Sequence, residues 1–126
     1  MEKKSKKSIK AAEFLETKKL YSSGVHCLYY AVYQKMINVL SVSYSYEEQQ
    51  DLFKGENSHN KFIEEICLLI KQEQRDSFKN SICFLKKMRC KADYNDKDID
   101  RKTFGKCKKI ALKLLIYLKN DIQNEK

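Results

Sequence analysis

The stretch SSGVHCLYYAVYQKMINVLSV, Ser22–Val42, carries the strongest helical signal in the chain. Its two leading serines suit the cap of a helix. Apolar side chains then recur three and four positions apart and form one stripe: Val25, Leu28, Tyr29, Val32, Met36, Val39 and Leu40. A second stripe carries small and polar side chains: Ser23, Cys27, Ala31, Gln34 and Asn38. Because this helix is apolar on several sides, we expect it at the centre of the fold, with neighbours packed around it.

The same periodicity predicts four further helices, over Ser5–Leu20, Ser58–Gln72, Gln74–Ala92 and Asp100–Asn120. The first of them has a narrow apolar face of Ala11, Phe14 and Leu15. The last follows an acidic turn in which Asp98 or Asp100 can accept hydrogen bonds from the free amides of the helix start. We expect residues 1–8 to be frayed, and residues 41–58 to form a mobile loop with no more than one helical turn.

Composition favours the same fold class. The 126 residues match the common size of one domain, so a single domain over residues 1–126 is expected. The chain has no proline, three glycines and no tryptophan, which leaves few turn residues for a β-rich or doubly wound fold. The prediction is therefore an all-α protein, a compact bundle of four long helices and a shorter one.

Cysteine usage and hydropathy indicate the compartment. The five cysteines are odd in number and never form a C-x-x-C pair, which favours reduced thiols in the core of a cytoplasmic protein. No apolar run approaches the roughly 18 residues of a membrane span. The start, MEKKSKKSIKAAEFLE, lacks the apolar segment of a secretory signal. We expect a cytosolic protein without membrane contact.

The net charge of +9 suits an anionic partner such as a nucleic acid. Basic residues gather at the start of the chain and on a ridge of the last predicted helix: Lys102, Lys106, Lys109 and Lys113. The ridge could track a phosphate backbone, but a solvated face opposite the core is the favoured explanation, as a frayed end is for the amino-terminal cluster. Two isolated histidines, His26 and His59, give no metal-ligand spacing, and no phosphate-cradling glycine loop is present. No metal or other cofactor is expected.

Arg89 is the most informative charged residue. Counted at about 100° per residue, it lies roughly 50° from the centre of the apolar stripe of its helix. A guanidinium placed there is partly desolvated and needs a carboxylate, a carbonyl or an anionic ligand. Two interpretations follow: a structural pair with Asp93 one turn later, or an anion or RNA contact made together with Asp93 and Tyr94, supported by the nearby Lys86 and Lys91.

The central helix also has a flank of His26, Tyr30 and Tyr33. This flank is either a core seam with polar tips or part of a cleft in which bases stack. In the first case, His26 donates a hydrogen bond to a neighbouring group and serves packing.

Two passages resemble the HEPN domain, a small helical module associated with nucleotides or RNA. They are LYSSGVHCLYYAVYQKM, Leu20–Met36, preceded by AAEFLETKK, and RCKADYNDKDID, Arg89–Asp100, before a last amphipathic helix. The resemblance covers most of the chain except Ser41–Ser58. It implies a helical bundle that dimerises, often a toxin or effector encoded beside a minimal nucleotidyltransferase. Many such proteins are metal-independent ribonucleases whose Arg and His, four to six residues apart, meet in a dimer cleft.

Arg89 matches that arginine, but the expected histidine positions hold Tyr94, Asn95 and Asp96. Histidine moves protons near neutral pH, whereas tyrosine titrates near pH 10. The resemblance, with its A-D-Y ending, therefore implies a non-nucleolytic accessory or binding partner of a nucleotidyltransferase in a toxin–antitoxin or defence system, with a cleft at Arg89, Asp93 and Tyr94. One alternative is an active ribonuclease toxin using these three residues, and a second is a structural dimerisation scaffold.

Overall fold

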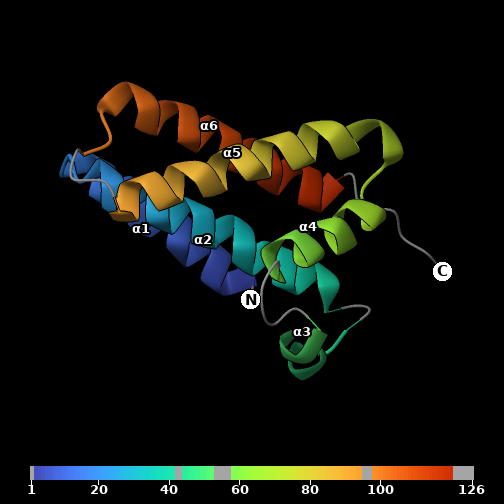
Figure 1. Ribbon diagram of the computed structural model, residues 1–126. Coiled ribbons are helices and arrows are strands. Elements are labelled where there is room, and N and C mark those ends of the chain that lie inside the picture. Colours follow the sequence, from blue (N-terminus) through green and yellow to red (C-terminus); the bar gives the residue numbers. More distant parts are fainter. Residues whose placement is uncertain (1, 42–43, 53–57, 95–97, 121–126) are drawn as a thin grey trace.

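The computed structural model describes residues 2–41, 44–52, 58–94 and 98–120, and it shows an all-helical protein (Figure 1). The elements are α1 (Glu2–Thr17), α2 (Tyr21–Leu40), α3 (Tyr46–Leu52), α4 (Ser58–Leu69), a short 3-10 turn (Gln72–Gln74), α5 (Arg75–Tyr94) and α6 (Arg101–Asn120). Within these ranges, no helix is both long enough and apolar enough to cross a membrane.

The central position predicted for α2 is confirmed. Figure 1 shows α1 along one side of α2 and the α5–α6 pair along the other, with α4 near the carboxyl end of α2 and α3 beyond it. Eight residues of α2 are buried: Gly24, Val25, Leu28, Tyr29, Ala31, Val32, Met36 and Leu40. The largest side chains that enclose them are Phe78 and Leu85 of α5, Phe104 and Leu114 of α6, and Ile66 of α4. A side chain on α2 can therefore meet partners from every other long helix.

The amino-terminal helix differs from the prediction. Residues 2–8 are helical instead of frayed, and Ser5 is buried with its hydroxyl donating to the carbonyl of Ala31 at 2.7 Å. Ser8 donates to the side-chain oxygen of Gln34 at 2.9 Å. Phe14, expected on the buried face, is 61% exposed. Small side chains on α1 and α2, such as those of Ser5 and Ala31, let the two helices approach closely. Hydrogen bonds and close backbone packing therefore hold α1 on α2 in place of a broad apolar face.

Part of the expected loop is also helical. Ser45 and Glu48 form a reciprocal cap at the start of α3: each backbone N–H donates to the other side chain, both at 3.2 Å. This capping box satisfies two amides that a short helix otherwise leaves without partners. The expectation of no more than one turn is therefore wrong for Tyr46–Leu52, whereas residues 42–43 and 53–57 lie outside the described part of the chain.

The cysteines are less uniformly buried than expected. All five are free thiols. Cys107 is buried, but Cys83 is exposed, so the prediction of a core thiol is wrong for Cys83. The remaining three, Cys27, Cys67 and Cys90, are half-buried. Cys83 lies on α5 between the buried Ile82 and the half-buried Phe84. Its side chain faces outward because this position falls outside the apolar stripe of the helix.

Gly24 lets α2 approach α6. A methyl group added at Gly24 would lie 2.5 Å from a ring carbon of Phe104, which is fully buried. We therefore expect Gly24→Ala to lower the free energy of unfolding by about 1–3 kcal/mol, because the ring has no room to move. A methyl group added at Gly105 would meet no atom within 4 Å beyond the adjoining backbone of α6, so Gly105→Ala is expected to raise the free energy of unfolding by about 0.5–1 kcal/mol. Urea denaturation of both variants measures this difference, and equal stabilities would contradict the close approach.

Candidate nucleic-acid interface

Two helices bring three chemically distinct side chains together. Arg89 and Asp93 lie one turn apart on α5, and His26 reaches them from the first half of α2. The Nε atom of Arg89 lies 3.9 Å from Oδ2 of Asp93, and Nδ1 of His26 lies 3.3 Å from Oδ1 of the same carboxylate. The pair of Arg89 with Asp93, one of the two interpretations drawn from the sequence, is present as a loose ion pair, and His26 joins it. We call these three residues the Arg–Asp–His cluster.

The guanidinium of Arg89 is largely buried and incompletely paired. Its side chain is 18% exposed and lies on the face of Tyr29, 4.9 Å from the ring centroid. Among the described residues, Nε has no hydrogen-bond partner, since Asp93 is too distant for one. Nη2 makes only a weak contact with Sγ of Cys90 at 4.0 Å. The N–H of Nε is buried as well as unpaired, so an incoming anion can meet only the outer nitrogens of the guanidinium, on the exposed 18% of the side chain.

The electrostatic surroundings keep Arg89 charged. Burial by itself disfavours the cation, but the contacts with Cys90, Tyr29 and Asp93 outweigh burial, so the pKa of Arg89 is raised above its ordinary value. Burial also raises the pKa of the Tyr29 hydroxyl, which stays neutral at physiological pH. The pair thus presents a permanent cation against a neutral ring.

Asp93 gives His26 a defined orientation. A carboxylate beside Nδ1 favours the tautomer with its proton on that nitrogen, which makes Nε2 the acceptor of the ring. His26 and Asp93 both line a hollow of about 350 Å³ at the start of α2. The chain before α6 is fixed to the same region, because the N–H of Ile99 donates to the hydroxyl of Ser22 at 3.1 Å. The arrangement can position a polar ligand and move a proton beside it.

The flank of His26, Tyr30 and Tyr33, which we call the aromatic row, runs along α2 from the cluster. The His26 and Tyr30 rings are 4.6 Å apart, and the Tyr30 and Tyr33 rings are 6.3 Å apart. Tyr30 is exposed and Tyr33 is half-buried, whereas Tyr29 on the inner side is buried. The inner edge of the row therefore belongs to the core, as the interpretation of a seam with polar tips predicted, and its outer edge is open to solvent.

The remaining predicted site residues lie farther out. Tyr94 is the last residue of α5 and is 83% exposed, so its ring faces solvent, and the ring that packs on Arg89 is that of Tyr29. Lys91 is exposed and Lys86 is half-buried on the same helix. The sequence predicted a neighbouring partner for His26 but did not identify it as Asp93, and it did not place Tyr29 on Arg89, because both contacts depend on the register between α2 and α5. The one available signal was the desolvation expected for Arg89.

Lysines of α6 are partly used inside the fold. The ammonium of Lys108 lies 3.0 Å from a carboxylate oxygen of Glu16, an interaction that raises the pKa of this lysine. The ammonium of Lys106 lies 4.9 Å from the ring centroid of Phe84, and that of Lys113 lies 5.5 Å from the ring of Tyr117. The contact of Lys108 ties α6 to α1 and that of Lys106 ties it to α5, whereas that of Lys113 lies within α6. Two members of the lysine ridge, Lys106 and Lys113, therefore pack on rings of the protein's own fold.

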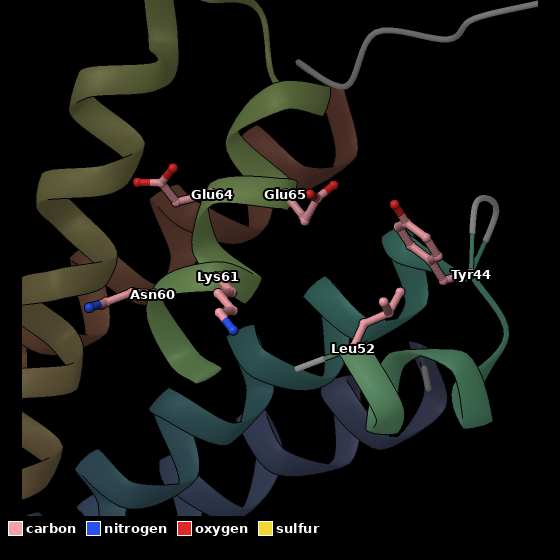
Figure 2. Close-up of a pocket in the computed structure, with 6 residues that line it drawn as sticks. All are labelled: Tyr44, Leu52, Asn60, Lys61, Glu64 and Glu65. Carbon is pink, nitrogen blue, oxygen red and sulfur yellow. The ribbon is translucent and has the colours of Figure 1, made fainter. Parts of the chain in front are cut away.

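A separate hollow of about 400 Å³ lies between α3 and α4. Figure 2 shows Tyr44 and Leu52 on one side of it, with Glu65 and Lys61 on α4 and with Glu64 pointing toward α5. Glu64 pairs there with Lys79 at 3.3 Å. Because two carboxylates line the hollow, it suits an anion less well than the surroundings of Arg89.

Neither metal-binding side chains among the described residues nor a similar known protein identifies the function of this site. Among the residues that the structure describes, no three His, Cys, Asp or Glu side chains gather closely enough to hold a metal ion. Comparison of the chain with protein-family models, curated proteins and solved structures finds no match.

Proposed function

We propose that this protein binds RNA or a nucleotide through a phosphate group held by Arg89. The observation that carries the proposal is the guanidinium of Arg89, which lies over Tyr29, is only loosely paired with Asp93 at 3.9 Å and remains 18% exposed. Arginine presents its N–H groups in a fork that matches two phosphate oxygens. The net charge of +9 attracts a polyanion and strengthens its encounter with the site.

The biological setting that we propose follows from the resemblance to HEPN domains. The protein would act in the cytoplasm as a homodimer, as a non-nucleolytic accessory or binding partner of a minimal nucleotidyltransferase in a toxin–antitoxin or defence system. The all-helical fold supports this proposal, because members of that family are helical bundles. The A-D-Y sequence after Arg89, at the place of the family's histidine, supports the non-nucleolytic role.

Binding of a fluorescein-labelled single-stranded RNA, followed by anisotropy at fixed salt, tests the phosphate site. We expect Arg89→Ala to weaken binding by about 10- to 100-fold, as for the loss of charged hydrogen bonds. Arg89→Lys should recover only part of the loss, because lysine keeps the charge without the fork.

Lys87→Ala provides the matched control for that experiment. It removes one positive charge from an exposed position of the same helix, and we expect a loss of no more than about threefold. Circular dichroism and size-exclusion chromatography establish that each variant is folded and has the same oligomeric state. Equal losses for Arg89→Ala and Lys87→Ala would mean that RNA senses only total charge, and the proposed site would be wrong.

One observation favours a second candidate, a metal-independent ribonuclease. The contact between His26 and Asp93 gives Arg89 a neighbouring histidine from another helix, although none follows Arg89 at the expected spacing. His26 would then accept the proton of the 2′-hydroxyl as its oxygen attacks the phosphorus, while Arg89 stabilises the charge on the phosphate. The bond from phosphorus to the 5′-oxygen would break, leaving a 2′,3′-cyclic phosphate and a 5′-hydroxyl that takes its proton from water. Incubation with labelled total RNA in a chelator separates the candidates: cleavage that is lost in both His26→Ala and Arg89→Ala would identify an enzyme.

A further inference from the structure

A small pocket lies where α2, α3 and α4 meet. It has a volume of about 240 Å³ and is lined by Tyr33, Ile37, Tyr46, Gln49, Gln50 and Phe62. None of these side chains is charged, so the pocket does not attract a phosphate group by itself. Its volume is below the roughly 300 Å³ at which pockets for drug-sized ligands begin. Size and lining therefore suit one flat, uncharged ring system.

Gln49 contributes a polar side chain to the pocket, and its amide is held in one orientation by hydrogen bonds. Its side chain is 5% exposed, and its Nε2 atom donates to the carbonyl oxygens of Ile37 at 3.3 Å and of Tyr44 at 3.1 Å. Only the amide nitrogen can serve two carbonyls, so Oε1 is left as an acceptor. Oε1 is buried and has no hydrogen-bond partner among the residues described. A buried acceptor of this kind is satisfied by a ligand that brings an N–H donor.

Aromatic side chains form two walls of the pocket. Tyr33 and Phe62 stack with their centroids 5.2 Å apart and their planes 26° apart. Tyr46 extends from α3 and remains exposed. Faces of tyrosine and phenylalanine are the surfaces on which proteins stack the bases of single strands. A nucleobase combines both properties that the pocket requires, a flat ring and N–H donors on its edge.

The pocket lies within reach of the proposed phosphate site, and the rings of Tyr29 and Tyr33 lie between the two. The guanidinium of Arg89 is 4.9 Å from the Tyr29 centroid, and Tyr29 is 6.2 Å from Tyr33, which lines the pocket. A helical strand advances about 3.4 Å per nucleotide. A single strand bound at Arg89 by one phosphate can therefore place a base two or three nucleotides away in the pocket.

We propose that the pocket between α2, α3 and α4 is a nucleobase subsite for the single-stranded RNA whose phosphate binds Arg89. The proposal rests on the proposed function, because it assigns a second contact to the same ligand. Tyr46 provides the open face on which the base stacks, and Oε1 of Gln49 accepts a hydrogen bond from the edge of the base.

The test uses a labelled eight-nucleotide RNA and a series of the same RNA with one abasic residue at each position in turn. We expect Tyr46→Ala to weaken binding of the intact RNA by about tenfold, as for the loss of one stacked base, and Tyr46→Phe to bind like the wild type. Leu52→Ala is the matched control, because it removes another exposed side chain of α3 that lines the neighbouring hollow instead. At one position of the series, the abasic residue should weaken binding by the wild type by the same factor of about ten. The same abasic RNA should bind Tyr46→Ala no more weakly than the intact RNA does.

Three outcomes would overturn the subsite, and they are distinguishable. If Tyr46→Ala binds the intact RNA like the wild type while Arg89→Ala does not bind, the phosphate site stands and the base pocket is wrong. If Tyr46→Ala weakens every abasic RNA as much as the intact one, Tyr46 acts through the fold and not through a base. If the wild type binds none of the RNAs, the proposed function fails and the subsite fails with it.

Discussion

Cys107 is expected to react with iodoacetamide in the native protein at least about 1,000-fold more slowly than Cys83. Cys107 is fully buried within α6, so the reagent reaches it only when the fold opens, whereas Cys83 is exposed on α5. Burial also raises the pKa of the Cys107 thiol to about 11, which leaves little reactive thiolate at neutral pH. Pulse labelling followed by peptide mass spectrometry resolves the two thiols. Similar rates for both in the native state, with equal rates in denaturant, would contradict the packing of α6.

The same thiol adds a pH dependence to stability. Because the folded-state pKa is raised, the folded protein favours the neutral thiol, and this contribution is complete below the unfolded pKa of about 8.5. This stabilising contribution is lost as the pH rises from about 8.5 through about 11. The free energy of unfolding should therefore fall across this range, and Cys107→Ala should reduce the slope.

Phe104→Ala is expected to lower the free energy of unfolding by about 3–5 kcal/mol, which corresponds to a fall in Tm of roughly 10–25 °C. Phe104 is fully buried, lies 5.5 Å from the ring of Tyr21 and fills the space beside Gly24. Truncation removes contacts between α6 and α2 and leaves a cavity. Thermal unfolding by circular dichroism measures the change.

Phe14→Ala is the matched control, because it removes the same side chain from a position that is 61% exposed. Its effect should stay within about 0.5 kcal/mol. Equal effects of the two substitutions would show that α6 does not pack on α2 as described. A further check is that Gly24→Ala should cost less in the Phe104→Ala background, since the ring that it opposes is then absent.

Periodicity predicted α2 and α6 well because each has a broad apolar stripe. The structure has helices at Tyr21–Leu40 and Arg101–Asn120 where Ser22–Val42 and Asp100–Asn120 were expected. The predicted cap of the last helix is present, because the N–H of Thr103 donates to the carboxylate of Asp100 at 2.7 Å. The buried face of α1 was missed because Ser5 carries no hydropathy signal. Similarly, α3 was missed because its signal is a capping box and not a stripe.

Only part of the candidate site could be predicted from the sequence, because the rest depends on how the helices pack together. Arg89 and Asp93 are one helical turn apart, so their proximity follows from counting along one helix. His26 and Tyr29 meet them only through the packing of α2 on α5, which local spacing does not determine. The pocket at Tyr46 depends in the same way on where α3 rests against α2 and α4.

The packed tyrosines of α2 also give the protein an optical property. The chain has eight tyrosines and no tryptophan, so its ultraviolet emission comes from tyrosine alone. The rings of Tyr29, Tyr30 and Tyr33 lie between 6.0 and 6.3 Å apart, close enough to exchange excitation energy. A quencher that touches one of these rings therefore dims the whole group. The binding of unlabelled RNA that we propose would therefore be measurable through the light that the protein itself emits.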